Sequence, residues 1–217
     1  MRLIDLSHCI APAMPSYPGL PEPRFRAVLS HDDPSRQKHY APGTTFQIAA
    51  YDFGGNTGTY VDAPFHRHAD GVDLAGVPLE KLANLEGVTI DSAPDGPTAA
   101  DAIRGLDLKN RAVLFRTNWS ARWGGDYFRS GPFLPADTCE ALVKAEPALV
   151  GIDCANIDNM QDPARPAHTI LLAAGILIVE HLTKLDSLPR EGFRFFAVPP
   201  AVEGGTSFPV RAFAVLP

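Results

Sequence analysis

The chain lacks the features that would tie it to a membrane or to an oxidising compartment. Its longest apolar run, Ile170–Val179, is shorter than the about 20 residues that a bilayer-spanning helix needs. Asp5 and His8 interrupt the first residues, which therefore lack the apolar centre of a secretory signal. Its 3 cysteines stand at long spacings with no C-x-x-C pair, which predicts neither a disulfide framework nor a thiolate zinc site. We expect a cytoplasmic protein with no membrane partner.

Dense clusters of positive charge are also missing. The 217 residues include 19 Lys and Arg against 25 Asp and Glu, for a net charge of −6. Lys and Arg never gather densely, which argues against a surface that follows a phosphate backbone. We expect the partner to be a small-molecule substrate and not a nucleic acid.

What the chain does contain is an α/β pattern. The hydrophobic fraction of 45% and the charged fraction of 20% are those of a globular protein. Three segments favour helices: Pro78–Leu85, Thr98–Leu106 and Pro135–Glu146. Short apolar runs bounded by Gly, Pro, Asp or Asn predict strands at Thr45–Tyr51, Gly87–Ser92, Ala112–Thr117, Ala148–Cys154, Gly175–Glu180, Phe193–Pro199 and Val210–Leu216. The pattern predicts one α/β domain over residues 1–217 with a central mixed sheet.

The segment "NTGTYVDAPFH", from Asn56 to His66, combines turn residues with acid/base groups. Pro64 biases the residue before it towards extended geometry. If the stretch before the proline is extended, Tyr60 and Asp62 share one face, with His66 beyond the turn. The segment then aims a phenol and a carboxylate at one point, although a plain surface turn would have a similar composition.

A second candidate group lies in "HTILLAAGILIVE", where His168 and Glu180 stand at the two ends of an apolar stretch. An unpaired carboxylate at the end of such a strand would be costly. Glu180 therefore either pairs with a neighbour such as His181 or Lys184, or serves as a metal ligand or general base. The residues alone leave these readings open.

Six segments, in this order along the chain, carry a resemblance to a known family. They are "DLSH" with "MPSYPG" (Asp5–His8, Met14–Gly19), "NTGTYVDAPFH" (Asn56–His66), "RTNWSARW" (Arg116–Trp123), "GIDCANID" (Gly151–Asp158), "HTILLAAGILIVEHLTKLDSLP" (His168–Pro189) and "PPAVEGGTSFPVRAFAV" (Pro199–Val215). Together they resemble the cyclase family of metal-dependent hydrolases, which includes bacterial kynurenine formamidase and isatin hydrolase. The second segment matches, in register, that family's hallmark of the form H-x-G-T-H-x-D-x-P-x-H.

The resemblance implies a fold, an assembly and a site. The fold would be a swivelling β/α/β-type single domain, usually assembled into homodimers or larger homo-oligomers. Carried over by position, Asp62 is a metal ligand and His66 is the catalytic histidine. His168 and Glu180 match the distal pair that completes the metal site.

Two positions depart from the hallmark, because Asn56 and Tyr60 stand where it has histidines. A carboxamide is a weak ligand and a phenol has a pKa near 10, so both bind Zn, Mn or Fe less well than imidazole does. We therefore expect at most one divalent ion, Zn or Mn, held weakly by Asp62, His168 and Glu180 or lost altogether. An amide and a phenol can instead hydrogen-bond a substrate carbonyl or oxyanion.

These expectations favour a hydrolase that acts on a C–N bond (amide, formamide or lactam) or a related ester or lactone of a small carbonyl substrate. His66 would carry the proton, and Tyr60 or Asn56 would stabilise the oxyanion. Apolar walls of the pocket, with a core role equally open for each, are expected from Phe65, Trp119 and Trp123. Two alternatives stay open: a metal-independent acid/base enzyme (dehydratase, isomerase or cyclase), and a non-catalytic small-molecule-binding homologue without the metal site.

Overall fold

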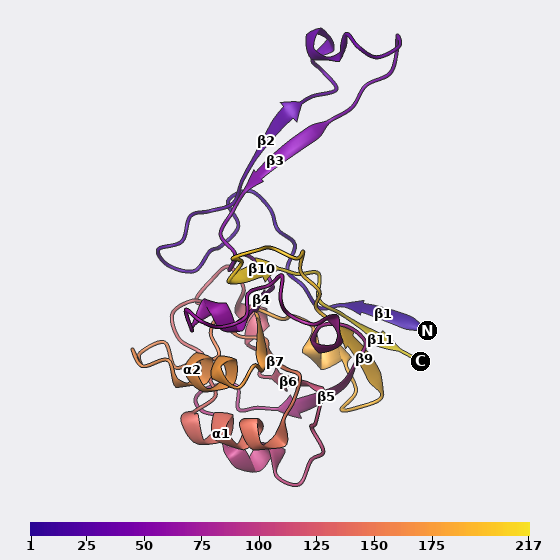
Figure 1. The fold of residues 1–217 in the computed structure, drawn as a ribbon. Coiled ribbons are helices and arrows are strands. Elements are labelled where there is room, and N and C mark those ends of the chain that lie inside the picture. Colours follow the sequence, from indigo (N-terminus) through magenta and orange to yellow (C-terminus); the bar gives the residue numbers. More distant parts are fainter.

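The computed structural model describes the backbone of residues 1–217 and every side chain except those of Pro34 and Arg36. A nine-stranded mixed sheet forms the body of the molecule (Figure 1). The strands from β5 to β8 run parallel, and the pairs on either side of them are antiparallel. In spatial order the strands are β1 (Arg2–Asp5), β11 (Phe213–Leu216), β9 (Phe193–Phe196), β5 (Leu85–Asp91), β6 (Ala112–Arg116), β7 (Leu149–Ile152), β8 (Leu177–Glu180), β4 (Tyr60–Asp62) and β10 (Ser207–Pro209).

Two α-helices cover one face of this sheet. Helices α1 (Ala136–Ala145) and α2 (Pro166–Ala173) contact each other, and α2 also contacts β8. The remaining helical turns are 3-10 helices: η1 (Pro34–Gln37), η2 (Pro64–His66), η3 (Leu79–Lys81), η4 (Ala100–Ile103), η5 (Trp119–Arg122) and η6 (Leu185–Ser187). Across the described chain, no helix combines the length and the apolar character that crossing a membrane requires.

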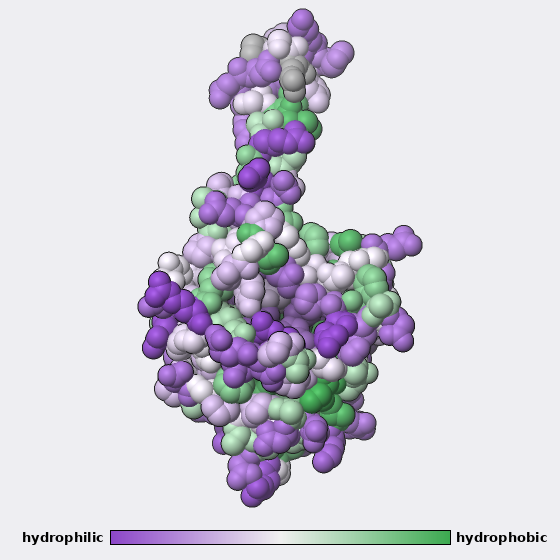
Figure 2. Space-filling view, turned by 90° about the vertical axis from the view of Figure 1, so that its left-hand side faces the viewer, coloured by the Kyte–Doolittle hydropathy of each residue, from purple (hydrophilic) through white to green (hydrophobic). Residues whose placement is uncertain are grey.

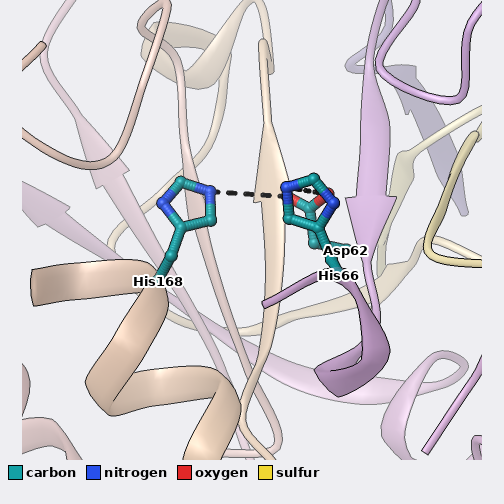
Figure 3. A group of neighbouring side chains, drawn as sticks. All are labelled: Asp62, His66 and His168. Carbon is teal, nitrogen blue, oxygen red and sulfur yellow. Dashed lines mark ion pairs between the residues drawn. The ribbon is translucent and has the colours of Figure 1, made fainter. Parts of the chain in front are cut away.

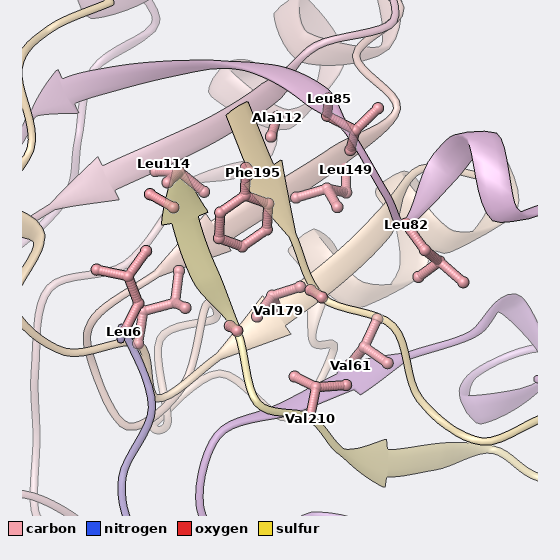
Figure 4. Close-up of a cluster of buried hydrophobic side chains, with 14 of the residues drawn as sticks. Leu6, Val61, Leu82, Leu85, Ala112, Leu114, Leu149, Val179, Phe195 and Val210 are labelled. Carbon is pink, nitrogen blue, oxygen red and sulfur yellow. The ribbon is translucent and has the colours of Figure 1, made fainter. Parts of the chain in front are cut away.

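The sheet separates two hydrophobic cores. Neighbouring residues of a strand point to opposite faces, so in β6 Val113 joins the core under the helices and Leu114 joins the other core. The helix-side core includes Leu142 of α1 and Leu171 of α2. The second core lies within the curled sheet, where Phe195 meets side chains from several strands (Figure 4). The strands between the cores are therefore buried on both faces, as parallel strands usually are.

A separate two-stranded sheet projects from the body. Strands β2 (Arg24–Leu29) and β3 (Ile48–Asp52) pair antiparallel, and we call the segment from Arg24 to Asp52 the arm. The arm extends away from the nine-stranded sheet (Figure 1), and in the space-filling view it is a narrow projection above a rounded body (Figure 2).

The expected mixed-sheet α/β architecture is confirmed, and the helix expected over Pro135–Glu146 matches α1. The helices expected over Pro78–Leu85 and Thr98–Leu106 are wrong, because only the short turns η3 and η4 form there. Asn84 and Gly105 adopt left-handed backbone conformations, with φ of 56° and 75°, and such residues end a helical segment.

Candidate active site and metal centre

The hallmark-like segment is held in place through its backbone and the side chain of Thr59. Thr59 Oγ1 donates to the carbonyl of His181 at 2.6 Å and accepts from the backbone N–H of His8 at 3.0 Å. After β4, Ala63 is extended and Pro64 begins η2, so the chain turns at once. The turn brings His66 back over the strand, with its Nε2 3.8 Å from Asp62 Oδ1.

The pairing of β4 with β8 sets the face on which the site forms. Tyr60 lies opposite Glu180 in the antiparallel register, and Asp62 lies opposite Ile178. These four side chains therefore share the face covered by α2. The Tyr60 hydroxyl donates to Glu180 Oε2, and the backbone N–H of Ile157 donates to Glu180 Oε1 at 2.6 Å. Glu180 is thus a buried carboxylate with both oxygens hydrogen-bonded.

Asp158 positions the second histidine of the site. Its carboxylate accepts from the backbone N–H groups of Ala167 and His168 at 2.6 and 3.2 Å, at the start of α2. It also lies 2.6 Å from His168 Nδ1. With Nδ1 engaged, Nε2 of His168 faces the site, 3.9 Å from both Asp62 Oδ2 and Glu180 Oε1. This arrangement, a carboxylate behind a histidine, is the one that orients metal-binding imidazoles.

Asp62, His66 and His168 form a group that could hold a metal ion (Figure 3). One ligand atom from each lies within 4.8 Å of the others. Asp62 is fully buried, and its Oδ2 has no hydrogen-bond partner in the described part of the chain. The His66 side chain is 30% exposed, so the group is open to solvent on that side. Two histidines and one carboxylate are a common ligand set for catalytic zinc, and they leave room for water.

The charges around this group favour a cation. Burial raises the pKa of Asp62 well above its ordinary value, and the nearby charge of Glu180 raises it further. Burial alone would lower the pKa of His168, but the hydrogen bond to Asp158 and the charges of Glu180 and Asp62 raise it to about 9. The carboxylates that hold a proton on His168 would equally favour a divalent ion at the same place.

Asn56 and Tyr60, the two positions expected to depart from the hallmark, are hydrogen-bonded within the site. Asn56 Nδ2 donates to Asp62 Oδ1 at 3.4 Å, and Asn56 Oδ1 accepts from Ser207 Oγ at 3.0 Å. Burial, followed by the charge of Glu180, raises the pKa of Tyr60 well above its ordinary value, so the phenol stays neutral. A neutral phenol and a carboxamide do not fit a second ion at this place.

A cavity of about 440 Å³ opens over the site. Of the residues that the sequence proposes for the site, Phe65, Trp119 and Trp123 are not among its lining side chains. Trp119 is buried in the helix-side core, and Trp123 stacks on His8 with ring centroids 3.7 Å apart. The lining comprises Tyr17, Pro18, Gly19, Leu20, Asn56, Tyr60, His66, Arg67, Asn156, Arg165, His168 and Glu180.

Asp158, Tyr17 and Arg165 are among the residues at the site that have no assigned role in the sequence-based prediction. Asp158 lies in "GIDCANID", which carries part of the family resemblance, so a role at the site could have been predicted for it. Tyr17 lies likewise in "MPSYPG". No sequence pattern pointed to Arg165, because it falls between two matched segments. Its place in the cavity wall is seen only in the folded structure.

Comparisons with known proteins agree with this architecture. The family model described as "Putative cyclase" matches residues 4–159. Kynurenine formamidase from Salinibacter ruber (strain DSM 13855 / M31) is 28% identical over 213 residues, which are 98% of this chain and 96% of that protein.

Solved structures show the same fold. Isatin hydrolase A from Labrenzia aggregata, bound to benzyl benzoate, superposes with a TM-score of 0.85 at 24% identity, covering 99% of this chain and 93% of that one. A "predicted metal-dependent hydrolase" from Bacillus stearothermophilus superposes with a TM-score of 0.77 at 25% identity, covering 98% and 97%. Because the family model spans most of the sequence and the fold agrees over nearly its whole length, the chain belongs to the cyclase family.

Proposed function

We propose that this protein hydrolyses the C–N bond of a small amide substrate with the help of one divalent ion, Zn or Mn. The observation that carries the proposal is the group of Asp62, His66 and His168, whose ligand atoms lie within 4.8 Å of one another beneath the cavity. The relatives named above support the reaction class, since one is a formamidase and the other a hydrolase of isatin, a cyclic amide.

The chain's own groups can be assigned around that ion. When bound, a divalent ion supplies Lewis-acid polarisation and acidifies water. Glu180 lines the cavity and accepts the proton of the attacking water at Oε1, then returns it to the leaving nitrogen as the C–N bond breaks. Asn56 lines the same cavity, and its amide N–H groups, one of which donates to Asp62, are assigned to the developing oxyanion. Tyr60 can donate only one hydrogen bond, and it donates that bond to Glu180. Tyr60 therefore positions Glu180.

This assignment exchanges two roles relative to the family-based expectation. That expectation makes His66 the proton carrier and Glu180 a ligand. The geometry favours the exchange, because His66 Nε2 lies with Asp62 and His168, whereas both oxygens of Glu180 already accept hydrogen bonds. Burial, followed by the charge of His168, lowers the pKa of His66, so its imidazole is neutral and offers a lone pair near pH 7.

The metal is tested first on purified protein. We expect about one Zn or Mn per chain by elemental analysis, loss of formamide hydrolysis after dialysis against a chelator, and recovery on adding either ion. Full activity of a demonstrably metal-free preparation would contradict the proposal and favour metal-independent acid/base catalysis. A protein that binds metal but turns over no formamide, lactam or ester would favour the non-catalytic alternative.

Two variants test the assignment of roles. His66→Ala should lose most of the metal, whereas Glu180→Gln should keep the metal and lose turnover. His31→Ala is the matched control, because His31 is exposed in the arm and hydrogen-bonds Thr45. The reverse result, with metal lost in Glu180→Gln and kept in His66→Ala, would restore the family-based assignment.

A further inference from the structure

Two arginines in the cavity wall form no ion pair with any carboxylate that the structure describes. Arg67 and Arg165 line the cavity beside His66 and His168. Six other arginines of the described part of the chain are paired with carboxylates. Those paired arginines are Arg104, Arg111, Arg116, Arg129, Arg194 and Arg211.

The first turn of α2 holds both arginines at the cavity. Arg67 Nε donates to Thr169 Oγ1 at 3.0 Å, and Thr169 Oγ1 donates to the carbonyl of Arg165 at 2.8 Å. Only Nε of Arg67 is engaged there, which leaves the two terminal nitrogens of the fork for another acceptor. A guanidinium anchored through Nε and open at its Nη groups is suited to bidentate recognition of a carboxylate.

Arg165 is half-buried and weakly satisfied. Its Nη1 lies 3.4 Å from the carbonyl of Asn159, and its Nη2 lies 3.5 Å from the Tyr17 hydroxyl, both at the limit of a hydrogen bond. Its backbone is left-handed, with φ of 49° and ψ of 59°, which costs free energy in a residue other than glycine. Arg165 therefore combines a strained backbone with an incompletely hydrogen-bonded guanidinium group at the cavity wall.

Two carboxylates of the site, Asp158 and Glu180, are already engaged by other groups. Asp158 accepts from the start of α2 and from His168, and Glu180 accepts from Tyr60 and Ile157. Because neither guanidinium group is ion-paired with a described carboxylate and both line the cavity, both are open to an anionic group that enters it.

We propose that Arg67 and Arg165 bind a carboxylate on the part of the substrate that does not react. The inference rests on the proposed amide hydrolysis and adds the substrate class: an anionic amide, such as a formamide that carries a carboxylate, is preferred to a neutral amide or lactam. Tyr17 and Leu20, which line the same cavity, face the body of that substrate.

The test compares a charged probe with a neutral probe of the same shape. The substrates are 2-formamidobenzoate and 2-formamidobenzamide, assayed with the metal-loaded wild type and with Arg165→Gln, Arg67→Gln and Arg165→Lys. We expect the wild type to favour the anion at least about 10-fold in kcat/KM. That ratio should fall about 10- to 100-fold in the glutamine variants, mainly through KM. Arg165→Lys should keep part of the preference, since it keeps the charge but loses the fork.

The matched control is Arg104→Gln, which removes an exposed arginine that pairs with Asp101 outside the cavity. It should leave the ratio unchanged. Metal content measured on every variant separates a binding effect from loss of the ion. Equal rates on the two probes in the wild type, or equal losses on both in the arginine variants, would overturn the inference while leaving amide hydrolysis in place.

Calorimetric binding of the two products, 2-aminobenzoate and 2-aminobenzamide, separates the inference from the proposed function. Binding that prefers the anion and depends on Arg165, in a protein that hydrolyses neither formamide, would support the arginine site and reject the reaction. Hydrolysis of both formamides without any arginine-dependent preference for the anionic product would do the opposite.

Discussion

Tyr60 stands at one of the two positions expected from the family resemblance to depart from a histidine, and the structure shows what surrounds its phenol. The ring is buried on β4, which lies between β8 and β10, and its hydroxyl donates to the buried carboxylate of Glu180. Asn56 likewise bridges Asp62 and Ser207. Both substituted side chains therefore connect the acidic residues of the site to the surrounding backbone and strands.

Removing this hydroxyl should cost stability without removing the metal. In Tyr60→Phe, Glu180 Oε2 would lose its described partner in a buried place, which typically costs about 1–3 kcal/mol of unfolding free energy. For a chain of this length, each kcal/mol lowers Tm by about 2–4 °C. The measurement is thermal unfolding together with metal content. Tyr51→Phe, in the exposed part of the arm, is the control and should unfold like the wild type.

Loss of the ion in Tyr60→Phe, with little change in Tm, would contradict this reading. It would make the phenol a ligand.

At the scale of elements, the sequence predicts the buried centre of the fold better than its edges. Strands β5, β6 and β7 are apolar on both faces and bounded by turn residues, so composition alone marks them. Helix α2 is not predicted from the sequence. A single turn containing Gly175 connects it to β8, so "HTILLAAGILIV" looks like one apolar stretch. Strand β2 is not predicted either, because it has no buried face and therefore no long apolar run.

The residues of the site likewise fall into those that the sequence predicts and those that it does not. Asp62, His66, His168 and Glu180 could be predicted together because a family pattern marks their positions, and the structure brings them to one place. The contacts of Asp158, by contrast, depend on where α2 docks, which no local pattern encodes. The pocket residues expected from aromatic character alone do not line the cavity, because large aromatic rings serve a core as readily as a pocket.

The segment after β1 is attached to the body through an aromatic stack that should respond to pH. His8 stacks on Trp123, and its Nε2 is buried without a described partner. Burial, and then the charges of His181 and Lys184, lower the pKa of His8 from 6.5 to about 4. The folded state therefore keeps His8 neutral where the unfolded chain binds a proton. Its contribution is present above pH 6.5 and is lost as the pH falls from there to about 4.

The measurement is the unfolding free energy from denaturant titrations between pH 7 and 4.5. His8→Phe keeps a ring on Trp123 but removes the titration, so its stability should fall less with acid than that of the wild type. His31→Ala is the control for an exposed histidine. Parallel pH profiles of the unfolding free energy for wild type and His8→Phe would show that His8 is not the source of this pH dependence.

At the scale of the whole molecule, no described contact within a single chain explains why the arm projects from the body. An isolated two-stranded sheet is marginally stable in water, and in the described part of the chain no third strand joins β2 and β3. Figure 2 shows hydrophobic surface on this projection. The exposed apolar side chains of the arm include Phe25 37%, Val28 40%, Tyr40 43%, Phe46 48%, Ile48 53% and Tyr51 62%. Exposed apolar surface of this kind is common at protein–protein contacts.

We expect the arm to contact a second copy of this chain, which agrees with the homo-oligomers implied by the family resemblance. Light scattering on the wild type at micromolar concentration should then give at least twice the chain mass. In Ile48→Ser with Tyr51→Ser, the dimer should weaken at least about 10-fold in Kd, since truncated interface anchors typically cost more than 1 kcal/mol each. Leu79→Ser is the control, because Leu79 is 62% exposed but lies outside the arm, and it should leave the mass unchanged. A wild type that stays monomeric, or a doubly substituted arm that still dimerises with wild-type affinity, would mean that these side chains face something other than a second copy.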